Sequence, residues 1–190
     1  MTHFTIHDEH SAPEASQPIL ASVRKRLGFI PNVFGVLAEA PVAAEAYGVL
    51  TDLVTRSSFT PTERHVVWFA NIVENDCNYC MAAHTSMAKL EGVPEDVIEA
   101  TRSRVPYADT SLEALREFTR SVIVNRGWVD EGELDAFFAA GYTQAQVLEI
   151  VVAVAHKVVS TYTNHIAHTP LDQAFQANAW QKPEPVAIAS

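Results

Sequence analysis

The sequence is poor in the residues that mark several large classes of protein. Its 190 residues include only 2 cysteines and 7 glycines, too few for a disulfide-stapled secreted scaffold or a collagen-like chain. It has neither a glycine-rich dinucleotide fingerprint nor a phosphate-binding loop, so we expect no cofactor. Basic residues are also scarce, since 13 Lys and Arg stand against 23 Asp and Glu and give a formal charge of −10. An acidic chain lacks the positive surface that phosphate backbones select, and we expect no nucleic-acid partner.

Long apolar runs are missing as well. The longest candidate, Ile150 to Ala155, stops at His156 and Lys157, well short of the roughly 18 residues that a membrane span needs. The polar first 18 residues lack the apolar core of a signal peptide. We therefore expect a cytoplasmic protein with no membrane partner. In that compartment two cysteines are more often catalytic or metal-binding than a structural disulfide.

The sequence is rich in signals that start helices. Thr60 suits an N-cap, Pro61 the first helical position, and Glu63 the third position, where it closes a capping box. Three further pairs have the same spacing before an apolar stretch, namely Thr110 with Glu113, Asp130 with Glu133, and Thr143 with Gln146. Strand-like alternation bounded by hairpin turns does not occur.

We therefore predict an all-α fold, a compact multi-helix bundle. The expected helices cover 18–27, 32–39, 41–56, 61–74, 78–91, 94–102, 111–125, 131–140 and 144–159, with short pieces at 160–168 and 170–178. No stretch of linker composition divides the chain, so we expect one domain over residues 1–190, with a core of roughly 18–178 and loose ends. The apolar helices 61–74 and 144–159 offer faces for a homo-oligomer.

The candidate chemistry lies in one short segment. Both cysteines of the chain, Cys77 and Cys80, are three residues apart, and His84 follows one turn later. On a helix these positions share one face. A helix start after the Asn75-Asp76 turn stabilises a thiolate, and a neighbouring imidazole lowers a thiol pKa further. A second thiol can then convert an oxidised one to an intramolecular disulfide.

Two plainer interpretations of this segment stay open. Free cysteines are among the most buried residues, so the pair can be core packing with a satisfied surface histidine beside it. The set can also bind zinc, if a second pair of ligands such as His165 and His168 comes close through folding. No second tight ligand motif is visible, and we expect no metal.

The segment resembles the alkyl hydroperoxidase D and carboxymuconolactone decarboxylase superfamily. Its thiol-active members carry a Glu, eleven residues, Cys-x-x-Cys, three residues and a His, and Cys77, Cys80 and His84 match. Residues 28–34 and 164–172 are similar to the terminal elements of a peroxidase-related branch. The resemblance implies a thiol-dependent peroxidase or disulfide oxidoreductase of the peroxiredoxin type on an all-helical fold. The resemblance further implies that the protein takes a small hydroperoxide or disulfide as substrate, needs an external reductant that the sequence does not name, and forms a homo-oligomer.

One position departs from that pattern. Where the family has its Glu, believed to relay protons to the cysteines, this chain has His65. Glu63 lies about 200° away around the helix and is explained by its capping box, while Glu74 can reach the thiols or be solvated. Because histidine moves protons near neutral pH, we predict a His65–His84 relay. If His65 is only a core residue, peroxide turnover should be poor.

The expected catalytic residues are therefore Cys77, Cys80, His84 and His65. Cys80 is the expected attacking thiolate and Cys77 its resolving partner, with the reverse assignment still open. Alternative functions are a decarboxylase on the same scaffold, which does not rely on a cysteine pair, and a redox-sensing or zinc-binding module without catalysis.

Overall fold

The computed structural model describes residues 4–183, and in these residues the chain is helical with no strand. Its helices are α1 Gln17–Leu27, α2 Asn32–Leu37, α3 Pro41–Thr55, α4 Pro61–Glu74, α5 Asn78–Leu90, α6 Glu95–Ser103, α7 Thr110–Val124, α8 Glu131–Ala139 and α9 Gln144–Ala167, with 3-10 turns η1 Glu14–Ser16 and η2 Gln173–Asn178. The predicted all-α class is confirmed, and the predicted range of α4 is the observed one.

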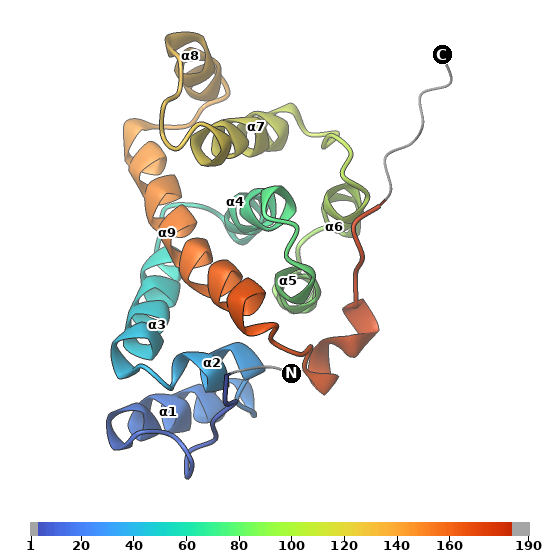
Figure 1. Cartoon of the computed structure of the whole chain (residues 1–190). Coiled ribbons are helices and arrows are strands. Elements are labelled where there is room, and N and C mark those ends of the chain that lie inside the picture. Colours follow the sequence, from blue (N-terminus) through green and yellow to red (C-terminus); the bar gives the residue numbers. More distant parts are fainter. Residues whose placement is uncertain (1–3, 184–190) are drawn as a thin grey trace.

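Helix α4 occupies the centre of the bundle. It contacts α5, α6, α7 and α9, and Figure 1 shows it surrounded by these helices. Every residue from Arg64 to Ile72 is buried, and burying side chains of this size contributes roughly 1.5–3 kcal/mol each. The prediction that helix 61–74 offers a face to another subunit is therefore wrong, because its apolar residues are used inside the protomer.

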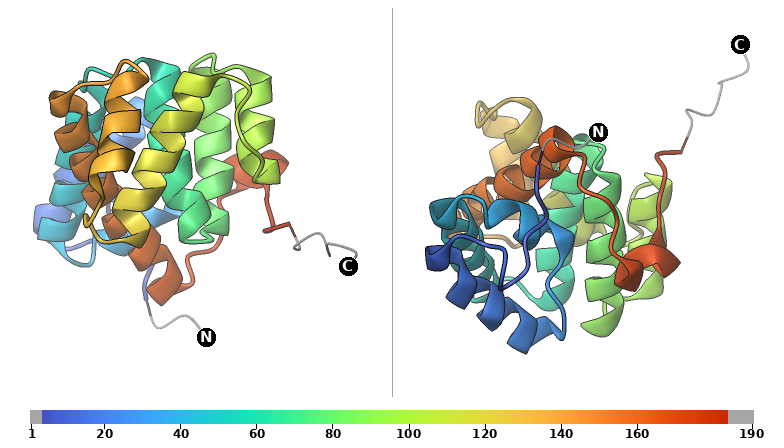
Figure 2. Two further views of the ribbon diagram at one scale, coloured as in Figure 1. Left: turned by 90° about the horizontal axis from the view of Figure 1, so that it is seen from above. Right: turned by 60° about the horizontal axis from the view of Figure 1, so that its bottom comes forward.

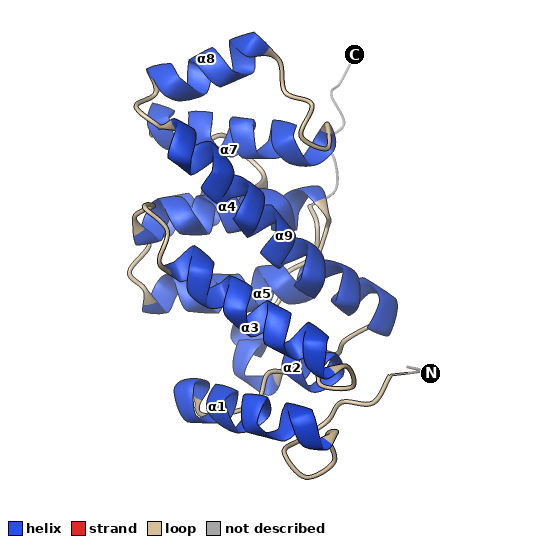
Figure 3. Cartoon of the chain, turned by 90° about the vertical axis from the view of Figure 1, so that its left-hand side faces the viewer, coloured by secondary structure: helices blue, strands red, loops and turns tan. Residues whose placement is uncertain are grey.

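Helix α9 crosses the bundle diagonally, as the side view in Figure 3 shows. We predicted a break near residue 160, but α9 continues to Ala167 because no Gly or Pro interrupts residues 143–169. By length and composition alone α9 could cross a membrane. Here it packs against α2, α3, α4, α5 and α7 and buries two basic side chains, as the core helix of a globular domain does.

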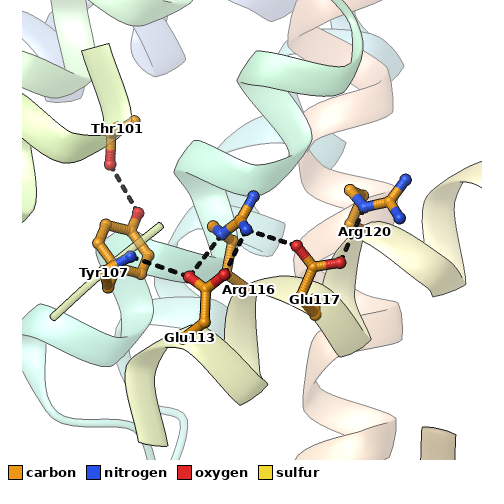
Figure 4. Close-up of polar contacts among 6 residues, drawn as sticks. All are labelled: Thr101, Tyr107, Glu113, Arg116, Glu117 and Arg120. Carbon is orange, nitrogen blue, oxygen red and sulfur yellow. Dashed lines mark hydrogen bonds and ion pairs between the residues drawn. The ribbon is translucent and has the colours of Figure 1, made fainter. Parts of the chain in front are cut away.

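Three of the four predicted capping boxes are present, at Thr60, Asp130 and Thr143. The fourth is wrong, because α7 begins one residue earlier than expected. Asp109 is its N-cap and accepts hydrogen bonds from the backbone of Ser111 and Leu112. Figure 4 shows that the Glu113 carboxylate instead accepts from the backbone N–H of Tyr107 and pairs with Arg116.

The segment before α1 is packed, although we expected residues 1–17 to be loose. The His7 N–H donates to the carbonyl of Gly35 in α2 at 3.0 Å, and Ala12 and Ser16 are buried. A Cβ at position 35 would lie 2.8 Å from the carbonyl oxygen of His7, so only glycine permits this approach. Residues 1–3 and 184–190 of the predicted loose ends lie outside the described residues.

The segment after α9 folds back over the bundle. Figure 2 shows η2 beside α5, which lies far from it in the sequence but close in space. The Asp172 carboxylate accepts from the Tyr79 hydroxyl at 2.5 Å and from the backbone N–H of Asn32 at 3.0 Å. Trp180 is buried and donates to the carbonyl of Arg102. These contacts tie the C-terminal segment to α2, α5 and α6.

Candidate active site

The turn between α4 and α5 places the two cysteines. Asn75 ends α4, Asp76 takes a left-handed conformation at φ 50°, and Cys77 is the N-cap of α5. Arg104 and Lys182 bind the Asp76 carboxylate and hold the turn. The Cys77 sulfur accepts from the backbone N–H of Cys80 at 3.3 Å, as an N-cap oxygen normally would. The predicted turn at 75–76 is confirmed.

Cys80 faces the polar side of α9. Its sulfur lies 3.5 Å from the Thr161 hydroxyl and 3.5 Å from the Asn164 amide nitrogen. Both cysteines are buried and free. Burial by itself raises the pKa of the Cys80 thiol, but hydrogen bonding with Cys77, the positive charge of Lys157, and the bonds from Thr161 and Asn164 hold that pKa well below its usual value.

The same interaction acts in the opposite direction on Cys77. Its hydrogen bond with Cys80, its burial and the negative charge of Cys80 raise the pKa of the Cys77 thiol. The two cysteines therefore differ in protonation, with Cys80 as the thiolate and Cys77 as the thiol.

A buried lysine completes this part of the site. Lys157 of α9 is 1% exposed, and its Nζ lies 3.0 Å from Nε2 of His84. Burial is the largest single effect and lowers the pKa of Lys157, but the interactions with Cys80, Tyr47 and Cys77 together outweigh it and the pKa is raised. The protonated ammonium must donate to Nε2, so the neutral His84 ring carries its own proton on Nδ1.

The two predicted histidines lie edge to face. The His65 and His84 ring centroids are 6.1 Å apart, and Nε2 of His65 is 3.4 Å from a carboxylate oxygen of Glu91. Burial lowers the pKa of His65 to about 4, although Glu91 acts against it. Burial and the charge of Lys157 lower the pKa of His84 as well. Both rings are neutral at pH 7.

A cavity of about 440 Å³ opens beside this cluster. Of the two cysteines, Cys80 is the one that lines it within the described chain, together with His84 and Lys157. The rest of its wall is largely apolar or aromatic, and includes Leu27, Phe29, Phe34, Trp68, Tyr79, Met87 and Phe175. The volume suits a small organic molecule with little polar surface.

Part of the chain matches the model of a known protein family. Residues 41–120, which hold α3, α4, α5 and both cysteines, match the model of the carboxymuconolactone decarboxylase family. The chain carries a carboxymuconolactone decarboxylase family domain. No curated protein matches the sequence.

Solved structures share the fold of the chain well beyond the residues that match the family model. The alkylhydroperoxidase AhpD core of a peroxidase-related protein from Ralstonia eutropha JMP134 superposes with a TM-score of 0.80, at 22% identity over 90% of this chain and 93% of that one. A peroxidase-related protein from Silicibacter sp. TM1040 gives 0.76, at 17% identity over 93% and 96%. A variant of the debrominase Bmp8 in complex with 2,3,4-tribromopyrrole gives 0.74, at 20% identity over 94% and 96%.

The family domain brings together the residues that the sequence singled out. Cys77, Cys80 and His84 lie in the first two turns of α5, and His65 lies on the adjacent face of α4. Glu63 is occupied by its capping box. Glu74 lines a separate cavity of about 140 Å³ with residues of α6 and α7, away from the thiols.

Two residues of the site were not identified from the sequence. Lys157 interrupts the most apolar helix, and a charge at such a position was the signal in the sequence that could have pointed to a buried partner. Glu91 follows α5 and reaches back to His65 and Arg64, which no spacing rule predicts.

The histidines proposed as further zinc ligands lie elsewhere. His165 and His168 are exposed, and no group of three or more His, Cys, Asp or Glu within residues 4–183 is placed to hold a metal. The ammonium of Lys157 at 3.0 Å from His84 also opposes a cation at that nitrogen.

Proposed function

We propose that the protein is a thiol-dependent peroxidase, a peroxiredoxin-type reductase of organic hydroperoxides that uses Cys80 and Cys77. The observation that carries this proposal is the placement of a low-pKa thiol, Cys80, on the wall of an apolar cavity, with a second thiol one helical turn away. The likeness to peroxidase-related structures supports the same chemistry.

The cycle uses both cysteines in order. The Cys80 thiolate attacks the terminal oxygen of the hydroperoxide, forming an S–O bond as the O–O bond breaks, and leaves a sulfenic acid and an alcohol. The Cys77 thiol then attacks the Cys80 sulfur, forms a disulfide and releases water. An external dithiol supplies two electrons and restores both thiols. Cys80 is favoured as the attacking residue because it lines the cavity and carries the lowered pKa.

The substrate is a small hydroperoxide or disulfide with an apolar body, as the cavity wall requires. We further propose that the protein acts in the cytoplasm as a homo-oligomer, without a nucleic-acid or membrane partner. Exposed apolar side chains on α3 and α9 favour a face between subunits, among them Val49, Leu53, Leu148 and Val151. Light scattering at working concentration tests the assembly.

The decisive experiment counts thiols and masses before and after one equivalent of cumene hydroperoxide. Wild type should lose both thiols with a mass decrease of about 2 Da, as an internal disulfide requires. Cys77→Ser should stop at the sulfenic acid with a gain of about 16 Da. Cys80→Ser should remain unoxidised. If Cys80→Ser consumes hydroperoxide as fast as wild type, the proposal is wrong.

A second candidate is removal of a halogen from an apolar aromatic compound by the same thiol pair. The cavity beside Cys80 and the likeness to the debrominase Bmp8 favour it. The reaction balances as a carbon–bromine bond and two thiols giving a carbon–hydrogen bond, a disulfide, a proton and bromide. Incubation of the reduced protein with 2,3,4-tribromopyrrole should then release bromide in step with thiol loss.

The remaining alternatives have direct tests. A decarboxylase on this scaffold would keep its activity after both thiols are alkylated, because it does not use them. A zinc-binding or redox-sensing module would bind one equivalent of zinc on elemental analysis, or would oxidise without turnover when a dithiol is supplied.

A further inference from the structure

Lys157 takes no part in the bond-making steps of the thiol cycle, and its position is costly. It is a fully buried cation in the middle of α9. Taking an ammonium out of water costs several kcal/mol even after relaxation, unless an opposite charge and hydrogen bonds compensate. A methionine of similar shape would avoid that cost, so the charge itself calls for an explanation.

The surroundings of Lys157 identify the compensating charge. The acidic groups that act on it are Cys80 and Cys77 of α5 and Tyr47 of α3, with Cys80 the largest. The pKa values of Cys77 and Tyr47 are raised, so Cys80 is the one of the three that carries a negative charge. No carboxylate in the described chain forms an ion pair with it. The other titratable groups that face it are neutral, namely His84 of α5, His156 beside it on α9, and His65 behind His84. Lys157 and the Cys80 thiolate are therefore each other's counter-ions.

The geometry also changes the role of His84. Its Nε2 is committed to Lys157 at 3.0 Å, whereas the Cys80 sulfur hydrogen-bonds with Thr161 and Asn164 of α9 and with Cys77. Because its pKa is lowered, the His84 ring is neutral, and its Nε2 carries no proton that it could donate. His84 thus holds Lys157 in place.

We propose that Lys157 is the catalytic acid of the site, delivering its ammonium proton to the oxygen that leaves when Cys80 attacks, and that His84 is a positioning residue for Lys157. This inference rests on the proposed thiol cycle. Lys157 lines the same cavity as Cys80, so a hydroperoxide bound there can contact both groups.

The proton balance closes over one turnover. As the S–O bond forms, the O–O electron pair moves to the alkoxide, and Lys157 protonates it to an alcohol and becomes a neutral amine. The proton of the Cys77 thiol leaves with the hydroxyl of the sulfenic acid as water. When an external dithiol reduces the disulfide, one of its protons returns to Cys77 and the other to Lys157, beside a new Cys80 thiolate.

The first test needs no peroxide. Lys157→Met removes the charge and nearly keeps the volume. It leaves the buried Cys80 thiolate without its counter-ion, which is destabilising unless the thiolate takes up a proton, so thermal unfolding first establishes that the variant is folded. Thiolate formation at Cys80, followed by its ultraviolet absorbance in a Cys77→Ser background, should shift to higher pH by more than one unit. An unchanged titration would overturn the inference, whether or not the protein proves to be a peroxidase.

The second test separates acid catalysis from thiolate stabilisation. In Lys157→Met, at a pH where Cys80 is ionised, oxidation by tert-butyl hydroperoxide should slow on the order of 100-fold, as loss of a general acid does. Oxidation by peracetic acid should change little, because acetate leaves without a proton. An equal loss with both oxidants would refute the acid role.

The third test concerns His84. Glutamine can accept a hydrogen bond from Lys157, whereas leucine cannot. His84→Gln should therefore keep most of the rate with tert-butyl hydroperoxide, and His84→Leu should behave like Lys157→Met. If both variants lose the same activity, His84 acts directly and not through Lys157. Thermal unfolding of each variant confirms that the comparison is between folded proteins.

Discussion

The size of the cavity predicts which substrates a single substitution will exclude. Ala83 lies one turn after Cys80 on α5 and lines the cavity of about 440 Å³. Phenylalanine at this position places a ring where the apolar part of a substrate would lie. A phenyl group buries on the order of 150 Å², which at about 25 cal/mol per Å² contributes at most about 4 kcal/mol to binding. Since association recovers only part of that, we expect a loss of about 1.5–3 kcal/mol.

Ala83→Phe should therefore lower kcat/KM for cumene hydroperoxide by roughly 10- to 100-fold. Hydrogen peroxide has no apolar body and is small enough to bind beside the added ring, so its kcat/KM should stay within about threefold of wild type. Steady-state rates with dithiothreitol as reductant measure both values. An equal fall with the two peroxides would mean that the ring distorts Cys80 rather than excluding substrate, and no fall with either would show that the cavity is not the substrate site.

Two further predictions concern stability. Burial holds the pKa values of His65 and His156 at about 4 and 3 in the folded protein, below the unfolded value of 6.5, so the unfolded chain takes up more protons as pH falls. The free energy of unfolding should fall by on the order of 3 kcal/mol per histidine as pH is lowered from 6.5 towards 4, and the melting temperature should fall with it. His156→Gln should flatten that dependence; an unchanged slope would contradict the assignment. Asp172→Ala leaves the Tyr79 hydroxyl and the Asn32 backbone N–H without their acceptor. It should cost about 1–3 kcal/mol in urea unfolding and speed amide exchange in residues 168–178; protection equal to wild type would show that this carboxylate does not hold the segment.

Local chemistry accounts for what could be predicted of the fold. A capping box needs only four residues, so Thr60, Asp130 and Thr143 mark their helices from sequence alone. The same rule fails at Thr110 because Asp109, one residue earlier, is a competing cap, and Arg116 with the Tyr107 backbone holds Glu113 elsewhere. The predicted break in α9 after Val159 fails because nothing in the backbone stops the helix there. The polar residues Thr161 and Asn164 that follow are buried and contact Cys80 of α5.

The candidate site likewise combines residues that local spacing predicts with residues that only the packing of helices brings together. Cys77, Cys80 and His84 share a helix face through their spacing, so their proximity follows once α5 is predicted. His65 meets them because α4 and α5 are joined by a two-residue turn and pack side by side. Its proposed relay to His84 stays a prediction. Glu91, 26 residues after His65, reaches it only because α5 runs back along α4.

Lys157 shows why a thiol motif alone does not specify the chemistry of its cysteines. The short motif places a histidine near two thiols and leaves that histidine as the natural base. In the folded chain, a residue 73 positions later takes the Nε2 of that histidine and supplies the charge that the thiolate needs. A lone lysine in an apolar helix is costly on its own, and a lone buried thiolate is equally so. Each is stable only beside the other, so the ion pair can be inferred only when α5 and α9 are known to pack together. A buried charge in the most apolar helix of a chain with a cysteine pair is therefore a specific reason to look for a partner at the thiol.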